Sequence, residues 1–134
     1  MSYLIKKAED NYKIAKISVN EGCYDVAVSR YYYFVYQSLV KFLYNENVIS
    51  PDSIGYNHNT TIDAFIGYCK ITNNYEQNRG ILKIGKLKNR RHESDYKDEL
   101  RINDIGSFKN KFENDFNEVV LALQSLNVLR DELW

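Results

Sequence analysis

The sequence predicts an all-α protein, an antiparallel bundle of about five helices. Proline and glycine are scarce, because the 134 residues contain one proline and six glycines. The two together usually make up about 12% of a chain. Apolar residues recur at steps of three and four over long stretches, which is the spacing of amphipathic helices. The length is typical of one domain, so we expect a single helical domain over residues 1–134.

The first two helices are predicted at residues 3–19 and 24–44. Gly22 lies between them and suits the left-handed turn that ends many helices. The second helix contains no proline or glycine, so it lacks the breaks that a set of strands would need. The side chains predicted to face inward in the first helix are Leu4, Ala8, Tyr12, Ala15 and Val19, with Ile5 and Ile14 at the edges. Those predicted to face inward in the second are Tyr31, Phe34, Val35, Leu39 and Phe42.

The remaining elements are separated by asparagine, proline and glycine. Pro51 marks a loop, and the Asn and Thr residues that follow it can cap a helix. Gly80 and Gly85 each cost a helix about 1 kcal/mol relative to alanine. The predicted elements are a loop at 45–57, a third helix from 59–61 to 73–74, a fourth helix at 75–92, a polar connection at 93–103 and a long fifth helix at 104–129.

The composition excludes several classes of protein. The 18 basic and 18 acidic side chains cancel, which argues against a globally basic nucleic-acid-binding protein but leaves room for a local basic patch. Cys23 and Cys69 are the only cysteines and are predicted to be free thiols in the reducing cytoplasm. His58 and His92 have no ligand-spaced partner, so neither a metal nor a cofactor is expected. No apolar run reaches membrane length, so no membrane partner is expected either.

The most informative polar pattern lies in residues 22–37. Arg30 and Gln37 are seven residues apart, so on a helix they project from one face about 10.5 Å apart along the axis, with Tyr33 near that face. A polar stripe of this kind is usually solvated surface. Four of the six residues 31–36 are tyrosine, however, and that is more than one core face can bury. Because tyrosine-rich surfaces often form interfaces, both interpretations stay open.

A second polar pattern lies in residues 83–92, which carry five basic side chains and no acid, while residues 93–99 are acid-rich. In one interpretation, these cations offset the dipole at the end of a helix, and Arg91 pairs with Asp95 inside the fold. In the other, the segment binds phosphate through Arg90 and Arg91, whose guanidinium groups donate two parallel hydrogen bonds.

Both patterns resemble family signatures. Residues 22–37 read Gly-Cys-Tyr-Asp-Val-Ala-Val-Ser-Arg-Tyr-Tyr-Tyr-Phe-Val-Tyr-Gln and residues 91–96 read Arg-His-Glu-Ser-Asp-Tyr. They are similar to the Ala-x-Arg-Ala-Tyr-Tyr-Ala-x-Phe-His helix and the Arg-x-x-Ala-Asp-Tyr motif of small bacterial and archaeal HEPN domains (higher eukaryotes and prokaryotes nucleotide-binding). His58 also fits a histidine common in that family. The resemblance covers residues 4–126 and assigns Asp25, Asp95 and Tyr96 to the structural motif.

The resemblance implies a helical bundle that often homodimerises, is often encoded beside a nucleotidyltransferase-type partner, and has RNA-linked roles. Nucleases of the family use an arginine and a histidine separated by four to six residues. The histidine acts on the ribose 2′-hydroxyl and the arginine stabilises the charge on phosphorus, without a metal. This chain has Arg30 but carries Gln37 at the histidine position. Glutamine has no proton that titrates near neutral pH, and His92 is the candidate substitute.

Three functions therefore stand as alternatives. The first is a catalytically impaired RNA- or nucleotide-binding module that regulates a toxin–antitoxin or defence system. The second is a metal-independent ribonuclease toxin, and the third is a homodimer with a purely protein-interaction role. The candidate catalytic residues are Arg30, Gln37 and His92, and the candidate RNA- or nucleotide-binding residues are Arg30, Tyr33, Gln37, Arg90 and Arg91.

Overall fold

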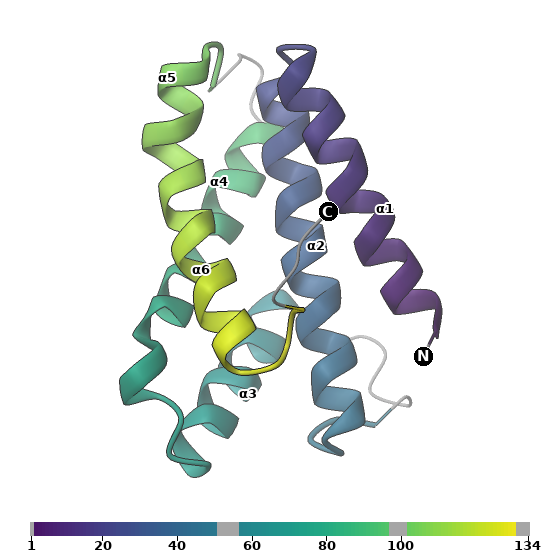
Figure 1. The fold of residues 1–134 in the computed structure, drawn as a ribbon, viewed down its shortest axis with the longest axis vertical. Helices are drawn as coiled ribbons and strands as arrows, with labels where there is room; N and C mark the ends of the chain where they lie inside the picture. The colour runs from purple at the N-terminus through teal and green to yellow at the C-terminus, as the bar shows by residue number, and fades with distance from the viewer. Residues whose placement is uncertain (1, 51–56, 97–101, 131–134) are drawn as a thin grey trace.

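The computed structural model describes residues 2–50, 57–96 and 102–130, and these residues form an all-α bundle with no strand (Figure 1). This confirms the predicted fold class. Pro51 lies outside the described residues. The elements are α1 (Ser2–Asn20), α2 (Tyr24–Asn45), α3 (His58–Ile71), the 3-10 segment η2 (Glu76–Lys83), α4 (Ile84–Tyr96), α5 (Ile105–Phe108), the π-helical segment η3 (Lys109–Glu113) and α6 (Asn114–Ser125).

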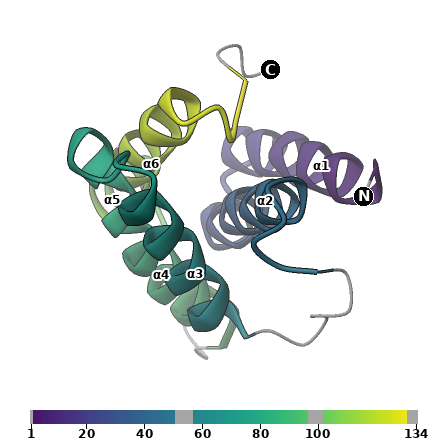
Figure 2. The same ribbon diagram turned by 90° about the horizontal axis from the view of Figure 1, so that it is seen from below.

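Helix α2 lies at the centre of the bundle. It contacts α1 on one side and α3 and α4 on the other (Figure 2). The α5–η3–α6 rod packs against η2 and α4. Successive long helices run up and down the bundle (Figure 1). Because α2 carries one signature segment and α4 the other, this arrangement brings the two segments together.

The turn between α1 and α2 is the one that the sequence predicts. Gly22 has a φ of 77°, which is the left-handed region that glycine adopts without steric cost. The amide of Gly22 donates to the carbonyl of Val19 at 3.1 Å, and the amide of Cys23 donates to that of Ser18 at 2.8 Å. These bonds satisfy the last carbonyls of α1, so the helix ends here and the chain reverses into α2.

The predicted core face of α2 is only partly right. Phe34, Val35 and Leu39 are buried as predicted, whereas the inward-facing Tyr31 and Phe42 of the prediction are half-buried. Tyr32 is fully buried although the prediction did not place it inside. The reason is that neighbouring helices cover α2 on two sides, so it buries more than the single face that a helical pattern reveals.

Two helix boundaries differ from the prediction. Helix α3 begins at His58, earlier than expected, because the side chain of Asn57 accepts a hydrogen bond from the amide of Thr60 at 2.8 Å and caps the helix. Helix α4 continues to Tyr96. Residues 93–96, predicted to be part of a polar connection, are therefore its last turn, and the rest of that acidic run, 97–99, lies outside the described residues.

The predicted fourth helix is interrupted near its start. Asn78 has the non-helical angles φ −132° and ψ 38°, so η2 precedes the regular helix α4. Gly80 accounts for the close packing at this point. A Cβ atom added there would lie 2.9 Å from the backbone oxygen of Glu118 on α6, a distance that real Cβ atoms essentially never reach. Glycine thus lets η2 approach α6.

The long fifth helix is present as one rod made of α5, η3 and α6 (Figure 1). Asp104 caps it by accepting from the amide of Ser107 at 2.7 Å. The rod ends at Ser125, before the predicted position 129, because Asn127 adopts a φ of 62° and turns the chain. Leu129 still packs against the core.

The two cysteines lie in different surroundings. Cys23 is exposed, Cys69 is buried, and both are free thiols. Within the described residues, no helix has the length and apolar character needed to cross a membrane.

Candidate functional site

Three tyrosines of α2 gather around His58, the first residue of α3. The rings of Tyr36 and His58 stack with centroids 4.0 Å apart and planes 11° apart. The hydroxyl of Tyr32 lies 2.7 Å from Nδ1 of His58, and the ring of Tyr33 meets the imidazole edge-on at 5.9 Å. These contacts fix the position of the histidine ring against α2.

His58 is held in its neutral form. Burial lowers the pKa of its imidazole, and the positive charges of Arg91 and Lys88 lower it further. Burial also raises the pKa of the Tyr32 hydroxyl well above its ordinary value. Near neutral pH, therefore, the hydrogen bond between Tyr32 and His58 joins two uncharged groups.

Arg91 of α4 is buried against the same tyrosines. It is 8% exposed, and the carbon of its guanidinium lies 5.3 Å from the ring centroid of Tyr32 and 5.5 Å from that of Tyr33. Its counter-ion is Asp95, at 3.7 Å from Nη1 to Oδ2. This confirms the predicted pairing, although the distance is too long for a hydrogen bond.

The guanidinium of Arg91 is poorly satisfied. Its buried Nε has no hydrogen-bond partner among the residues that the structure describes. Buried polar groups are nearly always hydrogen-bonded, so an orphaned donor of this kind requires an explanation. An arginine whose donors are unused and whose charge is only partly neutralised is suited to bind an anion.

Lys88 adds a second cation beside Arg91. It precedes Arg91 by three residues on α4, so the two lie on neighbouring parts of one helix face. It is half-buried, and within the part of the chain that the structure describes it forms no ion pair. We call this group the Arg91 cluster, which comprises Tyr32, Tyr33, Tyr36, His58, Lys88 and Arg91.

Two serine–carboxylate hydrogen bonds join α2 to α4 next to the cluster. Ser94 on α4 donates to Asp25 on α2 at 2.8 Å. Ser29 on α2 donates to Asp95 on α4 at 3.4 Å. The exposed Tyr96 lies at the same end of α4, with its ring 6.0 Å from the guanidinium of Arg91. These contacts position the two signature segments side by side.

Arg30 and Gln37 lie toward α1 and share one partner there. Nη1 of Arg30 donates to Oδ1 of Asn11 at 3.3 Å, and Nδ2 of Asn11 donates to Oε1 of Gln37 at 2.9 Å. Tyr33 is about 60° round the helix from Arg30, and its ring contacts His58 and Arg91 instead. The predicted stripe is thus divided between two neighbouring surfaces of α2.

Arg90 and His92 occupy the solvent side of α4. Arg90 forms an ion pair with Glu93 at 3.5 Å. His92 is exposed, and its ring lies 4.9 Å from that of Tyr96 on the same helix. The contacts of Arg30 and Gln37 are instead with α1, so the structure does not group His92 with them.

A family model described as HEPN domain matches residues 1–121. This chain belongs to the HEPN domain family. HEPN domains are generally nucleotide-binding or ribonuclease-like. Neither the curated proteins nor the solved structures contain a match to the chain.

Sequence reasoning missed four of the six members of this HEPN domain's cluster, which are Tyr32, Tyr36, His58 and Lys88. The sequence places His58 before the third helix and Lys88 within a basic run, and neither position links the residue to the tyrosines of α2. Lys88 and Arg91 are three residues apart on one helix, and this spacing predicts that their side chains lie on the same face. No local pattern places His58 against α2, because that contact joins residues 26 positions apart.

Proposed function

We propose that this HEPN domain binds RNA or a nucleotide at the Arg91 cluster without cleaving it. The observation that carries the proposal is Arg91, a buried arginine with an unpartnered Nε and tyrosine rings beside its guanidinium. Membership of the HEPN family supports the same class of ligand. The role that fits such a module is regulatory, within a toxin–antitoxin or defence system.

The side chains of the cluster suit a nucleotide, which carries both a phosphate and a base. Arg91 and Lys88 supply two positive charges, of which that of Arg91 pairs with Asp95 at 3.7 Å. Two neighbouring cations attract a phosphate group, and the guanidinium of arginine also donates directional hydrogen bonds to the phosphate oxygens. Tyr33 is half-buried and Tyr96 is exposed, so a ring face is available for an unpaired base, and such stacking contributes about 1–3 kcal/mol per base.

Gln37 supports the absence of cleavage. Its side chain accepts a hydrogen bond from Asn11, and an amide neither gives nor takes a proton in general acid–base catalysis. His58 does not replace it, since its Nδ1 lies 2.7 Å from the Tyr32 hydroxyl, whereas Arg30 and Gln37 bond to Asn11 of α1. His92 lies against Tyr96 on another helix.

The proposal includes the expected partners. The outer surface of α2 carries the exposed Val26 and Arg30, and this mixture of apolar and cationic side chains suits a homodimer interface. A nucleotidyltransferase-type partner encoded nearby, and a cytoplasmic location, remain part of the same proposal.

The test is a single assay that reads binding and cleavage together. A fluorescently labelled single-stranded RNA is titrated with the purified protein, anisotropy reports binding, and a denaturing gel of the same samples reports integrity. We expect binding that weakens as salt rises, with the RNA intact. Absence of binding at low salt contradicts the proposed ligand, whereas metal-independent cleavage favours the ribonuclease alternative.

A further inference from the structure

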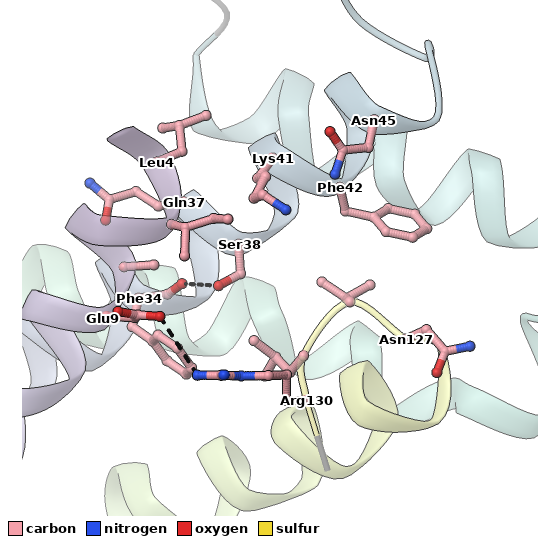
Figure 3. Close-up of a pocket in the computed structure, with 14 residues that line it drawn as sticks. Leu4, Glu9, Phe34, Gln37, Ser38, Lys41, Phe42, Asn45, Asn127 and Arg130 are labelled. Atoms are coloured by element: carbon pink, nitrogen blue, oxygen red, sulfur yellow. Dashed lines mark hydrogen bonds and ion pairs between the residues drawn. The ribbon is translucent and has the colours of Figure 1, made fainter. Parts of the chain in front are cut away.

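A second site lies on the opposite side of α2, away from the Arg91 cluster. It is a cavity of about 270 Å³ between the first half of α1, the second half of α2 and the segment that follows α6 (Figure 3). This volume is near the lower limit of about 300 Å³ for small-molecule pockets. It suits a ligand of modest size.

The walls of the cavity are built by regular contacts. The segment after α6 is fixed because the amide of Val128 donates to the carbonyl of Leu123 at 2.8 Å, and Gln124 donates to the carbonyl of Arg130 at 2.9 Å. The floor is apolar. Its apolar side chains are Leu4, Ile5, Ala8, Phe34, Phe42, Val128 and Leu129.

Among the described residues, the rim of the cavity carries one cation that forms no ion pair, Lys41. Arg130 forms an ion pair with Glu9 at 3.6 Å, so the opposite charges of these two lining residues offset each other. Lys41 also lines the cavity and is half-buried. Within the described part of the chain it forms no ion pair. A half-buried cation above an apolar floor attracts an anion that carries an apolar body.

Gln37 adds hydrogen-bond donors to this rim. A guanidinium only donates, so the bond from Arg30 requires Asn11 to accept through Oδ1 and hence to donate through Nδ2. Gln37 must then accept through Oε1. Its Nε2 hydrogens take no part in this chain of bonds, and Gln37 is one of the residues that line the cavity.

We propose that this cavity binds a small amphipathic anion, a monocarboxylate or similar singly charged head on a short aromatic or aliphatic body. The head lies at Lys41 and Gln37, and the body lies on the floor formed by Phe34, Phe42 and Leu129. This site is separate from the nucleotide site proposed above, and it is independent of whether RNA binds there.

The test uses 4-phenylbutyrate as the probe and isotope-labelled protein observed by NMR. We expect saturable shifts confined to residues 4–9, 34–45 and 127–130, which line the cavity, with a Kd of about 1 mM for a ligand of this size. The uncharged analogue 4-phenylbutanol should bind about fivefold more weakly. Shifts that lie elsewhere, or equal binding of the two compounds, overturn the proposal.

Two variants and one control complete the test. Lys41→Gln should weaken binding of 4-phenylbutyrate about fivefold, and Ser38→Leu, which fills the cavity from α2, should abolish it. Lys13→Gln makes the same charge change at an exposed position of α1 and should leave binding unchanged. Circular dichroism confirms that each variant is folded. If Lys41→Gln binds the probe as well as Lys13→Gln does, the proposal is overturned.

Discussion

The hydroxyl of Tyr32 lies 2.7 Å from Nδ1 of His58, and this contact ties the fully buried centre of α2 to the first residue of α3. It fixes the imidazole under the ring of Tyr36. Because Arg91 packs against the same Tyr32 ring, one tyrosine organises both the histidine and the arginine of the cluster.

Loss of the Tyr32 hydroxyl should destabilise the protein. In Tyr32→Phe the ring remains, but Nδ1 of His58 loses its partner, and an unpaired buried polar group costs about 1–3 kcal/mol. Urea denaturation measures the change in the free energy of unfolding. Tyr24→Phe is the matched control, because the half-buried ring of Tyr24 packs on Phe108. Equal losses in the two variants would refute the role given to the Tyr32 hydroxyl.

Acidification should weaken the fold through His58. Burial lowers its pKa below the ordinary value, with Arg91 and Lys88 contributing. The unfolded chain therefore binds the proton more readily, and the stability present above about pH 6.5 is lost as the pH falls through and below that value. Unfolding by urea at about pH 7.5 and about pH 5.5 measures the loss. Between these pH values His58→Asn should lose less free energy of unfolding than the wild-type protein. His92→Asn, which changes an exposed position, should lose as much as the wild-type protein.

Two glycines should respond to alanine in opposite directions. At Gly80 the new Cβ would lie 2.9 Å from the backbone oxygen of Glu118, and overpacking of this kind costs about 1–3 kcal/mol. At Gly85 nothing lies within 4 Å of the new Cβ, so Gly85→Ala should gain up to about 1 kcal/mol from helix propensity. Thermal unfolding of both variants measures the two changes in stability. A stabilised Gly80→Ala protein would contradict the close approach of η2 to α6.

A histidine in place of Gln37 tests the proposal that the protein binds RNA without cleaving it. Arg30 and Gln37 are linked through Asn11, so a histidine at position 37 would lie near the exposed arginine. General acid–base catalysis contributes about 10²–10⁴-fold, and Gln37→His should cleave RNA that the wild-type protein leaves intact. The double variant that also carries Arg30→Ala should be inactive. Equal cleavage by wild type and Gln37→His would contradict the proposal that Gln37 prevents cleavage.

Much of the fold is readable from the sequence because its signals are local. Apolar spacing gives α1 and α2 to within a residue or two of their ends, and Gly22 specifies the turn between them. The start of α3 is not determined in the same way, because several neighbouring Asn and Thr residues can serve as caps. Only the folded chain selects Asn57.

The candidate site is less readable because it is assembled from three separate segments. Arg91 is predicted by its basic run, and its pairing with Asp95 by their spacing of four residues on one helix. The full burial of Tyr32 and the position of His58 depend on how α3 and α4 pack on α2, which no local pattern encodes. The division between Tyr33 and the pair Arg30 and Gln37 likewise arises because α1 and α4 cover different sides of α2.

The central claim is that the Arg91 cluster binds a phosphate-containing ligand, and two lysines of α4 test it most directly. Lys88 is half-buried beside His58, whereas Lys86, two residues earlier, is exposed. RNA affinity is measured by anisotropy over a range of salt concentrations for Lys88→Gln and Lys86→Gln. We predict that Lys88→Gln weakens binding about fivefold and lowers the salt slope by about one, while Lys86→Gln binds as wild type. Equal effects of the two substitutions, or none from either, would contradict the account.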